Sequence, residues 1–179
     1  LLNNCSIDVA VVVLPHHYYL ETISSLANRG VHVIKEKPFA TSVAEALQLQ
    51  TLIKEKGIYI GVTVQRRFNP IFQAFHQLKR RIGKIYSIEG RYTMNIASLE
   101  NGWRSSKQLS GGGALADMGY HYIDLLVWYM GIPDTVTARL SRGNRLKQQY
   151  DMEDTAHLIF DYSLYGSYEE KTVGSFIIS

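Results

Sequence analysis

The first third of the chain alternates between apolar strand patterns and amphipathic helix patterns, and this order restricts the fold more than any other feature. Residues 7–14 form a continuous valine-rich run, which is typical of a parallel strand buried on both faces. Ser42 and Glu45 form a capping-box pair at a helix start, and Gly57 marks its end. The other expected elements are helices over residues 18–28 and 43–56 and strands over residues 31–34 and 58–64. Short connections between such elements predict an α/β unit with a doubly wound parallel sheet.

The periodicity changes after residue 64. Asn69 and Pro70 are a helix-start signal, and residues 84–96 alternate strictly between apolar and polar, as a strand with one open face does. The remaining expected elements are an apolar helix over residues 114–130 and strands over residues 135–141, 155–165 and 168–178. We therefore expect residues 1–64 to form one domain and residues 65–179 a second, α+β domain with an open, mostly antiparallel sheet.

The glycine-rich stretch SGGGALADMGYHYID, residues 110–124, places three polar groups in an apolar helix. Asp117, His121 and Asp124 share one helical face at spacings of four and three. A buried acid beside a buried imidazole costs free energy unless the groups are paired or used. One interpretation is a functional site, and the other is a helix that satisfies its own histidine with its own aspartate. The three glycines are expected to turn the backbone tightly and to leave free amides at the helix start.

The stretch VHVIKEKP, residues 31–38, brings a second candidate group to the end of a strand. In open α/β sheets ligands bind outside the carboxyl ends of the strands, where Glu36 and Lys37 would lie. Lys37 could be held near a substrate oxygen, and Pro38 stiffens the chain after it. The alternative interpretation is a surface ion pair of Glu36 with Lys35 or Lys37.

Composition argues against several other classes of protein. The net charge is only +3, and the basic clusters are too short for a nucleic-acid surface, so no nucleic-acid partner is expected. Two aspartates and a histidine within residues 114–130 argue against a membrane span. No spacing completes a metal site, and none matches G-x-G-x-x-G. The single Cys5 cannot form an internal disulfide and is expected to be a buried thiol, which fits a cytoplasmic location.

In combination, these motifs resemble one known family. The order IDVAVVVLPHH, GVHVIKEKP, VQRRFNP, WR, SGGGALADMGYHYID and MEDTAHLIF is similar to the glucose–fructose oxidoreductase, inositol dehydrogenase and rhizopine-catabolism (Gfo/Idh/MocA) family along essentially the whole chain. The resemblance implies the second half of a Rossmann domain that binds NAD or NADP, followed by the α/β domain with the open sheet. It also implies a missing N-terminal phosphate loop and missing final strands. We therefore expect the chain to be a fragment, inactive by itself.

The resemblance also implies roles for individual residues. Lys37, Asp117 and His121 would be catalytic, with His121 as the base. The full sets implied are Leu14, Pro15, His16, Glu36 and Lys37 for the cofactor, and Arg67, Trp103, Arg104, Asp117 and His121 for the substrate. The family usually has Thr-Pro-Asn at residues 14–16, so the cofactor contacts there differ in detail.

The activity implied is hydride transfer between the nicotinamide and a secondary alcohol or ketone of a sugar or cyclitol. Two alternatives share the fold, namely a catalytically silent regulator that senses a nucleotide or sugar, and an NAD-assisted glycoside hydrolase. A homo-oligomer formed through the sheet of the second domain is expected, because that sheet has an open face.

Overall fold

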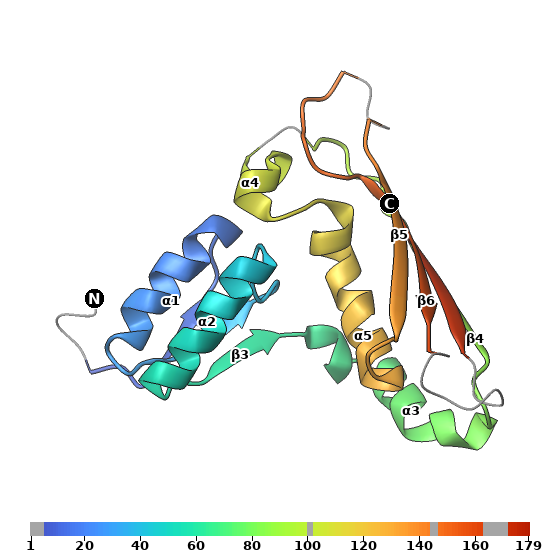
Figure 1. Cartoon of the computed structure of the whole chain (residues 1–179), viewed down its shortest axis with the longest axis horizontal. Coiled ribbons are helices and arrows are strands. Elements are labelled where there is room, and N and C mark those ends of the chain that lie inside the picture. The colour runs from blue at the N-terminus through green and yellow to red at the C-terminus, as the bar shows by residue number, and fades with distance from the viewer. Residues whose placement is uncertain (1–5, 100–101, 144–146, 163–171) are drawn as a thin grey trace.

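The first third of the chain forms a three-stranded parallel sheet that carries two helices. The computed structural model describes residues 6–99, 102–143, 147–162 and 172–179. The sheet has the order β1-β2-β3, and both pairings are parallel. Its elements are β1 (Val9–Val12), η1 (His16–Tyr18), α1 (Tyr19–Ala27), β2 (His32–Glu36), α2 (Val43–Lys56) and β3 (Ile60–Thr63) (Figure 1). These elements confirm the expected α/β order.

Both helices of this sheet pack on the same face. Val12, Ile23, Val33 and Leu49 are buried in the core between the sheet and α1 and α2. The opposite face is open, and Val11 is 70% exposed. The expectation that residues 7–14 are buried on both faces is therefore wrong for this structure. The physical reason is that successive right-handed crossovers in one direction across a sheet leave both helices on one side.

The helix ends follow the signals in the sequence. Ser42 Oγ accepts a hydrogen bond from Glu45 N at 3.1 Å, and Gly57 ends α2 in the left-handed conformation with φ 64°. The carboxylate of Glu45 departs from the usual capping box, since it accepts from Thr41 N at 2.7 Å. Asn69 Oδ1 accepts from Ile71 N at 2.9 Å and caps α3 (Pro70–Leu78).

The remaining two thirds of the chain form a four-stranded sheet with the order β4-β7-β6-β5. The pairing of β4 with β7 is parallel and the other two are antiparallel, so the sheet is mixed and mostly antiparallel. Its strands are β4 (Ser87–Tyr92), β5 (Thr135–Ser141), β6 (Thr155–Asp161) and β7 (Val173–Ile178). The helical elements that precede β4 are η2 (Gln65–Phe68), α3 and η3 (Lys79–Ile82). Those that lie between β4 and β5 are η4 (Trp103–Ser105), α4 (Lys107–Ser110), η5 (Leu115–Gly119) and α5 (Tyr120–Met130).

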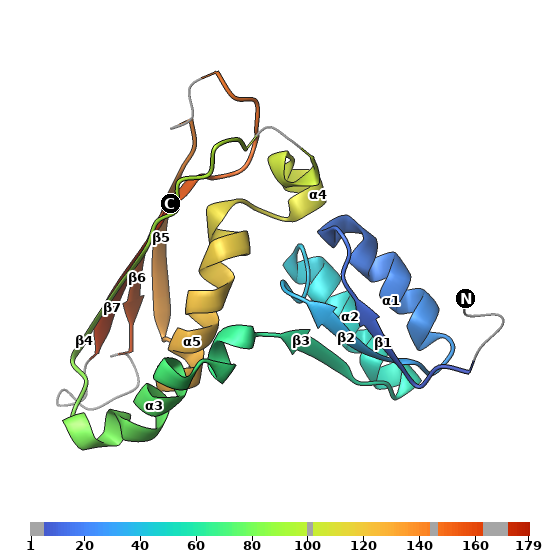
Figure 2. The same ribbon diagram turned by 180° about the vertical axis from the view of Figure 1, so that it is seen from behind.

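Helix α5 runs along one face of this sheet and closes the second core (Figure 2). Leu126 meets Leu158, Phe160 and Phe176 there. Strand β4 is shorter than the expected strand over residues 84–96, although Met94 N still donates to Ser179 O. Residues 163–171, into which two expected strands extend, and Cys5 lie outside the described residues.

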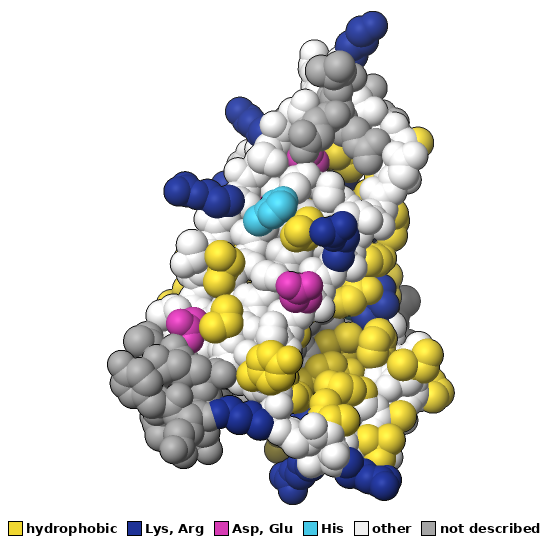
Figure 3. Space-filling model, turned by 90° about the vertical axis from the view of Figure 1, so that its right-hand side faces the viewer, with side chains coloured by type: hydrophobic (Ala, Val, Ile, Leu, Met, Phe, Trp, Pro, Cys, Tyr) yellow, Lys and Arg dark blue, Asp and Glu magenta, His cyan; other side chains and the backbone are white. Residues whose placement is uncertain are grey.

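Among the residues that the structure describes, no helix covers the other face of the second sheet. Figure 3 views the molecule from the side of this sheet and shows charged and hydrophobic side chains interspersed, with the hydrophobic ones denser in one lower region. Ile159 is 54% exposed on this face. In the described parts of the chain, no helix is both long and apolar enough to cross a membrane.

The segment expected as one continuous helix over residues 114–130 has two parts. Residues Leu115–Gly119 form a π-helix, η5, and a regular α-helix follows from Tyr120. Gly119 lies against the sheet so closely that a Cβ would meet Ile178 Cδ1 at 2.6 Å. A π-turn is rare and is frequently found at functional sites. It changes the residue spacing per turn around Asp117 and His121, while the Asp117 charge still acts on the His121 imidazole.

Candidate active site

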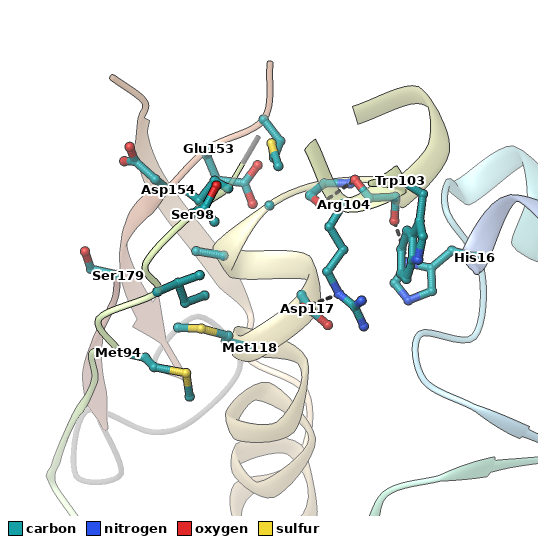
Figure 4. A pocket seen from close by; sticks show the side chains of 17 residues that line it. His16, Met94, Ser98, Trp103, Arg104, Asp117, Met118, Glu153, Asp154 and Ser179 are labelled. Atoms are coloured by element: carbon teal, nitrogen blue, oxygen red, sulfur yellow. Dashed lines mark hydrogen bonds and ion pairs between the residues drawn. The ribbon is translucent and has the colours of Figure 1, made fainter. Parts of the chain in front are cut away.

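The candidate site lies where the carboxyl ends of the first sheet face η5. Lys37, just after β2, donates from Nζ to Asp117 O at 2.7 Å and to the carboxylate of Asp117. Arg104 reaches the other oxygen of this carboxylate, with 3.5 Å between Nε and Oδ2 (Figure 4). The structure thus brings together Lys37, Asp117 and Arg104, which the sequence analysis assigned to the site. The interpretation of Lys37 as a surface partner of Glu36 is not what the structure shows.

Asp117 is held in its ionised form. Burial raises the pKa of its carboxyl, but the hydrogen bond and charge of Lys37, helped by Arg104 and His16, outweigh burial, so the net pKa lies below its usual value. Its negative charge in turn compensates the ammonium of Lys37, whose side chain is only 14% exposed.

His121 has an unused ring nitrogen. Its Nδ1 is buried and has no hydrogen-bond partner among the described residues. The carboxylate of Asp117 is engaged by Lys37 and Arg104, so the helix does not satisfy its own histidine. Burial, together with the charges of Lys37 and Arg66, lowers the pKa of His121 below 6.5. The imidazole is therefore neutral at neutral pH.

Arg66 is a residue that the sequence analysis missed. Its guanidinium lies over two aromatic rings, 4.9 Å from the centre of Tyr122 and 5.4 Å from that of Tyr92. It contributes positive charge to the environment of His121. Its neighbour Arg67 points elsewhere and forms a two-pronged pair with Asp124, at 2.8 Å and 2.5 Å. Because the two arginines are adjacent, the sequence contains no signal that distinguishes which one faces His121.

Two residues join the halves of the molecule above the site. The ring of His16 is buried, and its Nδ1 lies 2.8 Å from Ser110 O, to which it donates. Trp103 meets the same ring edge-on, with centroids 4.3 Å apart, and carries the guanidinium of Arg104 over its face (Figure 4). Leu14 and Pro15 lead into this junction from β1, and Glu36 is the last residue of β2. Their expected contacts with a cofactor stay predictions.

Lys35 supports the loop that carries Lys37. Its side chain is fully buried, and its Nζ donates to Pro38 O and, at 3.2 Å, to Phe39 O. The ammonium also lies 3.5 Å from the centre of the Tyr19 ring. Burial lowers the pKa of Lys35 to about 8. A charged residue at an inward position of an alternating strand was the available signal, but the sequence analysis named Lys35 only as a possible surface partner of Glu36.

The glycines before η5 allow the backbone to approach neighbouring segments more closely than a side chain would permit. A Cβ on Gly113 would lie 1.8 Å from Glu153 O. The amides at the start of η5 are not free, which corrects the expectation from sequence. Ala114 N donates to Glu153 O at 2.9 Å, and Leu115 N donates to Glu153 Oε1 at 3.0 Å. The carboxylate of Glu153 thus occupies the position that an anion would need.

A pocket of about 140 Å³ opens beside Asp117, between η5 and the segment that follows β4 (Figure 4). Trp103 and Arg104 form its wall on the side of the junction. Candidate catalytic groups and a space for a small molecule are therefore adjacent. Among the described residues, no group of three or more potential metal ligands is placed to hold an ion.

Comparison with known proteins identifies the class to which this fold and site belong. Residues 1–64 match the model described as "Oxidoreductase family, NAD-binding Rossmann fold", and residues 77–169 match the "GFO/IDH/MocA C-terminal domain". The chain belongs to the Gfo/Idh/MocA family of oxidoreductases. The matched description confirms the expected cofactor class, a nicotinamide dinucleotide.

Individual relatives are similar over most of this chain. The levoglucosan dehydrogenase of Pseudarthrobacter phenanthrenivorans is 30% identical over 79% of this chain and 37% of that protein. The scyllo-inositol 2-dehydrogenase (NADP(+)) of Bacillus subtilis is 28% identical over 90% of this chain and 45% of that protein. The chain spans about half the length, or less, of the curated relatives it matches.

Among solved structures, the WlbA dehydrogenase from Bordetella pertussis, in complex with NADH and UDP-GlcNAcA, superposes with a TM-score of 0.86. It is 24% identical, and the match covers 99% of this chain and 50% of that one. At this identity the likeness shows the fold alone.

Proposed function

We propose that the protein containing this chain is an NAD(P)-dependent oxidoreductase that oxidises a secondary alcohol of a sugar or cyclitol, or reduces the matching ketone. The observation that carries the proposal is the pairing of Lys37 with Asp117, which borders a pocket, together with His121, whose imidazole experiences both charges and whose Nδ1 is unpartnered in the described part of the chain. The relatives named above, a levoglucosan and a scyllo-inositol dehydrogenase, support the substrate class.

The residues present fit a dinucleotide at the carboxyl ends of the first sheet. Thr63 Oγ1, at the end of β3, and His17 Nδ1, after β1, are buried without a hydrogen-bond partner among the described residues. Leu14, Pro15, His16, Glu36 and Lys37 are proposed to hold the cofactor there, in accordance with the rule that ligands bind outside these strand ends. When bound, the nicotinamide accepts or donates the hydride.

His121 is proposed as the general base. A neutral imidazole accepts a proton, and the lowered pKa of His121 keeps it neutral at physiological pH. Lys37 stabilises the negative charge that develops on the substrate oxygen, since Asp117 takes two of its three donors and one remains for the substrate. Asp117 holds Lys37 in place and orients substrate hydroxyls together with Arg104.

The test is turnover of a panel of sugars and cyclitols by the complete gene product with NAD and NADP. We expect Lys37→Ala and His121→Ala each to lower kcat/KM by about 100-fold or more. Lys54→Ala, on the exposed side of α2, is the matched control and should keep full activity. Near wild-type turnover in both site variants would contradict the assignment. Release of free sugar without net NADH formation would favour the hydrolase, and absence of any turnover the silent regulator.

A further inference from the structure

Three of the four methionines in the chain meet in the pocket beside Asp117. Met94 lies on the segment that follows β4, Met118 on η5, and Met152 on the segment before β6. Ile96, Leu99 and Trp103 complete an apolar lining around them. Methionine side chains are flexible and polarizable, so they adapt to apolar groups of irregular shape.

Three polar side chains that border this pocket, Ser110, Glu153 and Asp154, already make hydrogen bonds within the protein. Glu153 Oε1 accepts from Leu115 N, and the carboxylate of Asp154 accepts from the hydroxyl of Tyr150. The hydroxyl of Ser110 donates to Ser106 O or Gly112 O, both at 2.8 Å. A sugar hydroxyl placed among these groups would have to share acceptors that already hold a bond within the protein.

The size of the pocket suits a ring-sized apolar group. Its volume is about 140 Å³, and a cavity of about 150 Å³ lined by Leu, Ile and Phe is known to bind benzene. Asp117 and Arg104 border the same pocket, so an occupant there is next to the groups assigned to the hydroxyl that reacts.

We propose that this pocket receives an apolar substituent of the substrate. The substrate class is then a sugar derivative that carries an alkyl or aryl group, such as a glycoside, and a free, fully hydroxylated sugar is the poorer substrate. This inference rests on the proposed function for its catalytic part, whereas the binding of an apolar group to the pocket is independent of turnover.

Binding is tested by NMR on the chain with ¹³C-labelled methionine methyl groups. Phenyl β-D-glucopyranoside is expected to shift the signals of Met94, Met118 and Met152. Met130, which packs against the second core and does not border the pocket, is the internal reference. D-Glucose should bind at least tenfold more weakly, because even one methylene in an apolar pocket is worth about 10-fold or more.

A variant tests whether the phenyl glucoside binds in the pocket or elsewhere on the surface. Met94 is 47% exposed, so Met94→Gln should fold normally and weaken binding of the phenyl glucoside about tenfold. Ile132→Gln, at an 82% exposed position outside the pocket, is the matched control and should bind as the wild type does. Equal shifts with D-glucose, or no shift with the phenyl glucoside, would overturn the proposal.

Kinetics on the complete gene product form the second arm. We expect kcat/KM for the phenyl glucoside to exceed that for D-glucose at least tenfold. A ratio of one or less overturns the apolar-pocket proposal and leaves the oxidoreductase proposal intact. If neither compound is turned over, the catalytic assignment fails for this sugar, and the methionine shifts alone decide whether the pocket binds the apolar group.

Discussion

Lys37 donates to both the backbone carbonyl and the carboxylate of Asp117, a residue 80 positions further along the chain. This pair links the loop after β2 to η5, and therefore links the two halves of the molecule at the candidate site. Several expected outcomes depend on it or on the groups around it.

The Lys37–Asp117 pair should make the free energy of unfolding depend on pH in the acid range. The folded pKa of Asp117 is below its usual 3.8, so its stabilising contribution is present above that value and is lost as the pH falls through the folded pKa. Asp117→Asn should unfold at a lower denaturant concentration than wild type at pH 7. The difference should disappear at acid pH, as measured by urea unfolding from pH 7 downward. A difference that is constant across this range would contradict the ionic role.

The pH profile of turnover should report the environment of His121. A base whose pKa lies below 6.5 remains active to more acid pH, so the acid limb of kcat/KM should lie below that value. Arg66→Met removes one of the positive charges that lower this pKa, and the limb should move upward. Arg80→Met, which removes an exposed arginine on η3, should leave the limb unchanged.

Burial of Lys35 should make the protein more stable at alkaline pH. Its folded pKa is about 8, against 10.5 when exposed, so between these values the unfolded chain binds a proton that the folded chain does not. The free energy of unfolding therefore rises with pH across this window, by about 3 kcal/mol in total. Unfolding titrations of wild type and Lys35→Met from pH 7 to 10.5 should show the rise only in wild type.

The close contact at Gly113 should make it intolerant of substitution. In Gly113→Ala the new Cβ would overlap Glu153 O, and the backbone would have to move, at a cost of about 1–3 kcal/mol or more. Gly61→Ala is the matched control, because its Cβ would meet atoms only at 4.0 Å. Thermal unfolding of the two variants should separate them clearly. Equal melting temperatures would show that the segment before β6 yields without cost.

The expected homo-oligomer through the second sheet stays a prediction. Ile159→Lys places a charge on the open face of that sheet, where it would be desolvated in an interface. We expect this variant to dissociate to a monomer in light scattering. Ile71→Lys, at a 75% exposed position on α3, should keep the wild-type mass. An unchanged mass in the Ile159 variant would rule out this face.

Much of the fold follows from local signals in the sequence. The capping residues Ser42 and Asn69 and the terminal Gly57 act within one helical turn, so they mark the ends of α2 and the start of α3 without tertiary information. Alternation along residues 155–161 likewise predicts which side chains enter the second core, because a strand has a period of two. Burial of residues 7–14 was predicted wrongly, since coverage of a sheet depends on which side each crossover takes.

The candidate site likewise has features that follow from local sequence and features that depend on tertiary structure. The sequence by itself determined that Lys37 follows a strand and that Asp117 and His121 lie in an apolar helix, because these are local properties. Only the tertiary structure decided that Asp117 bonds Lys37 and not His121, because it places the loop after β2 against η5. It also decided that Lys35 is buried and that Arg66, not Arg67, faces His121. Such choices depend on contacts between residues far apart in the chain, and no local pattern contains them.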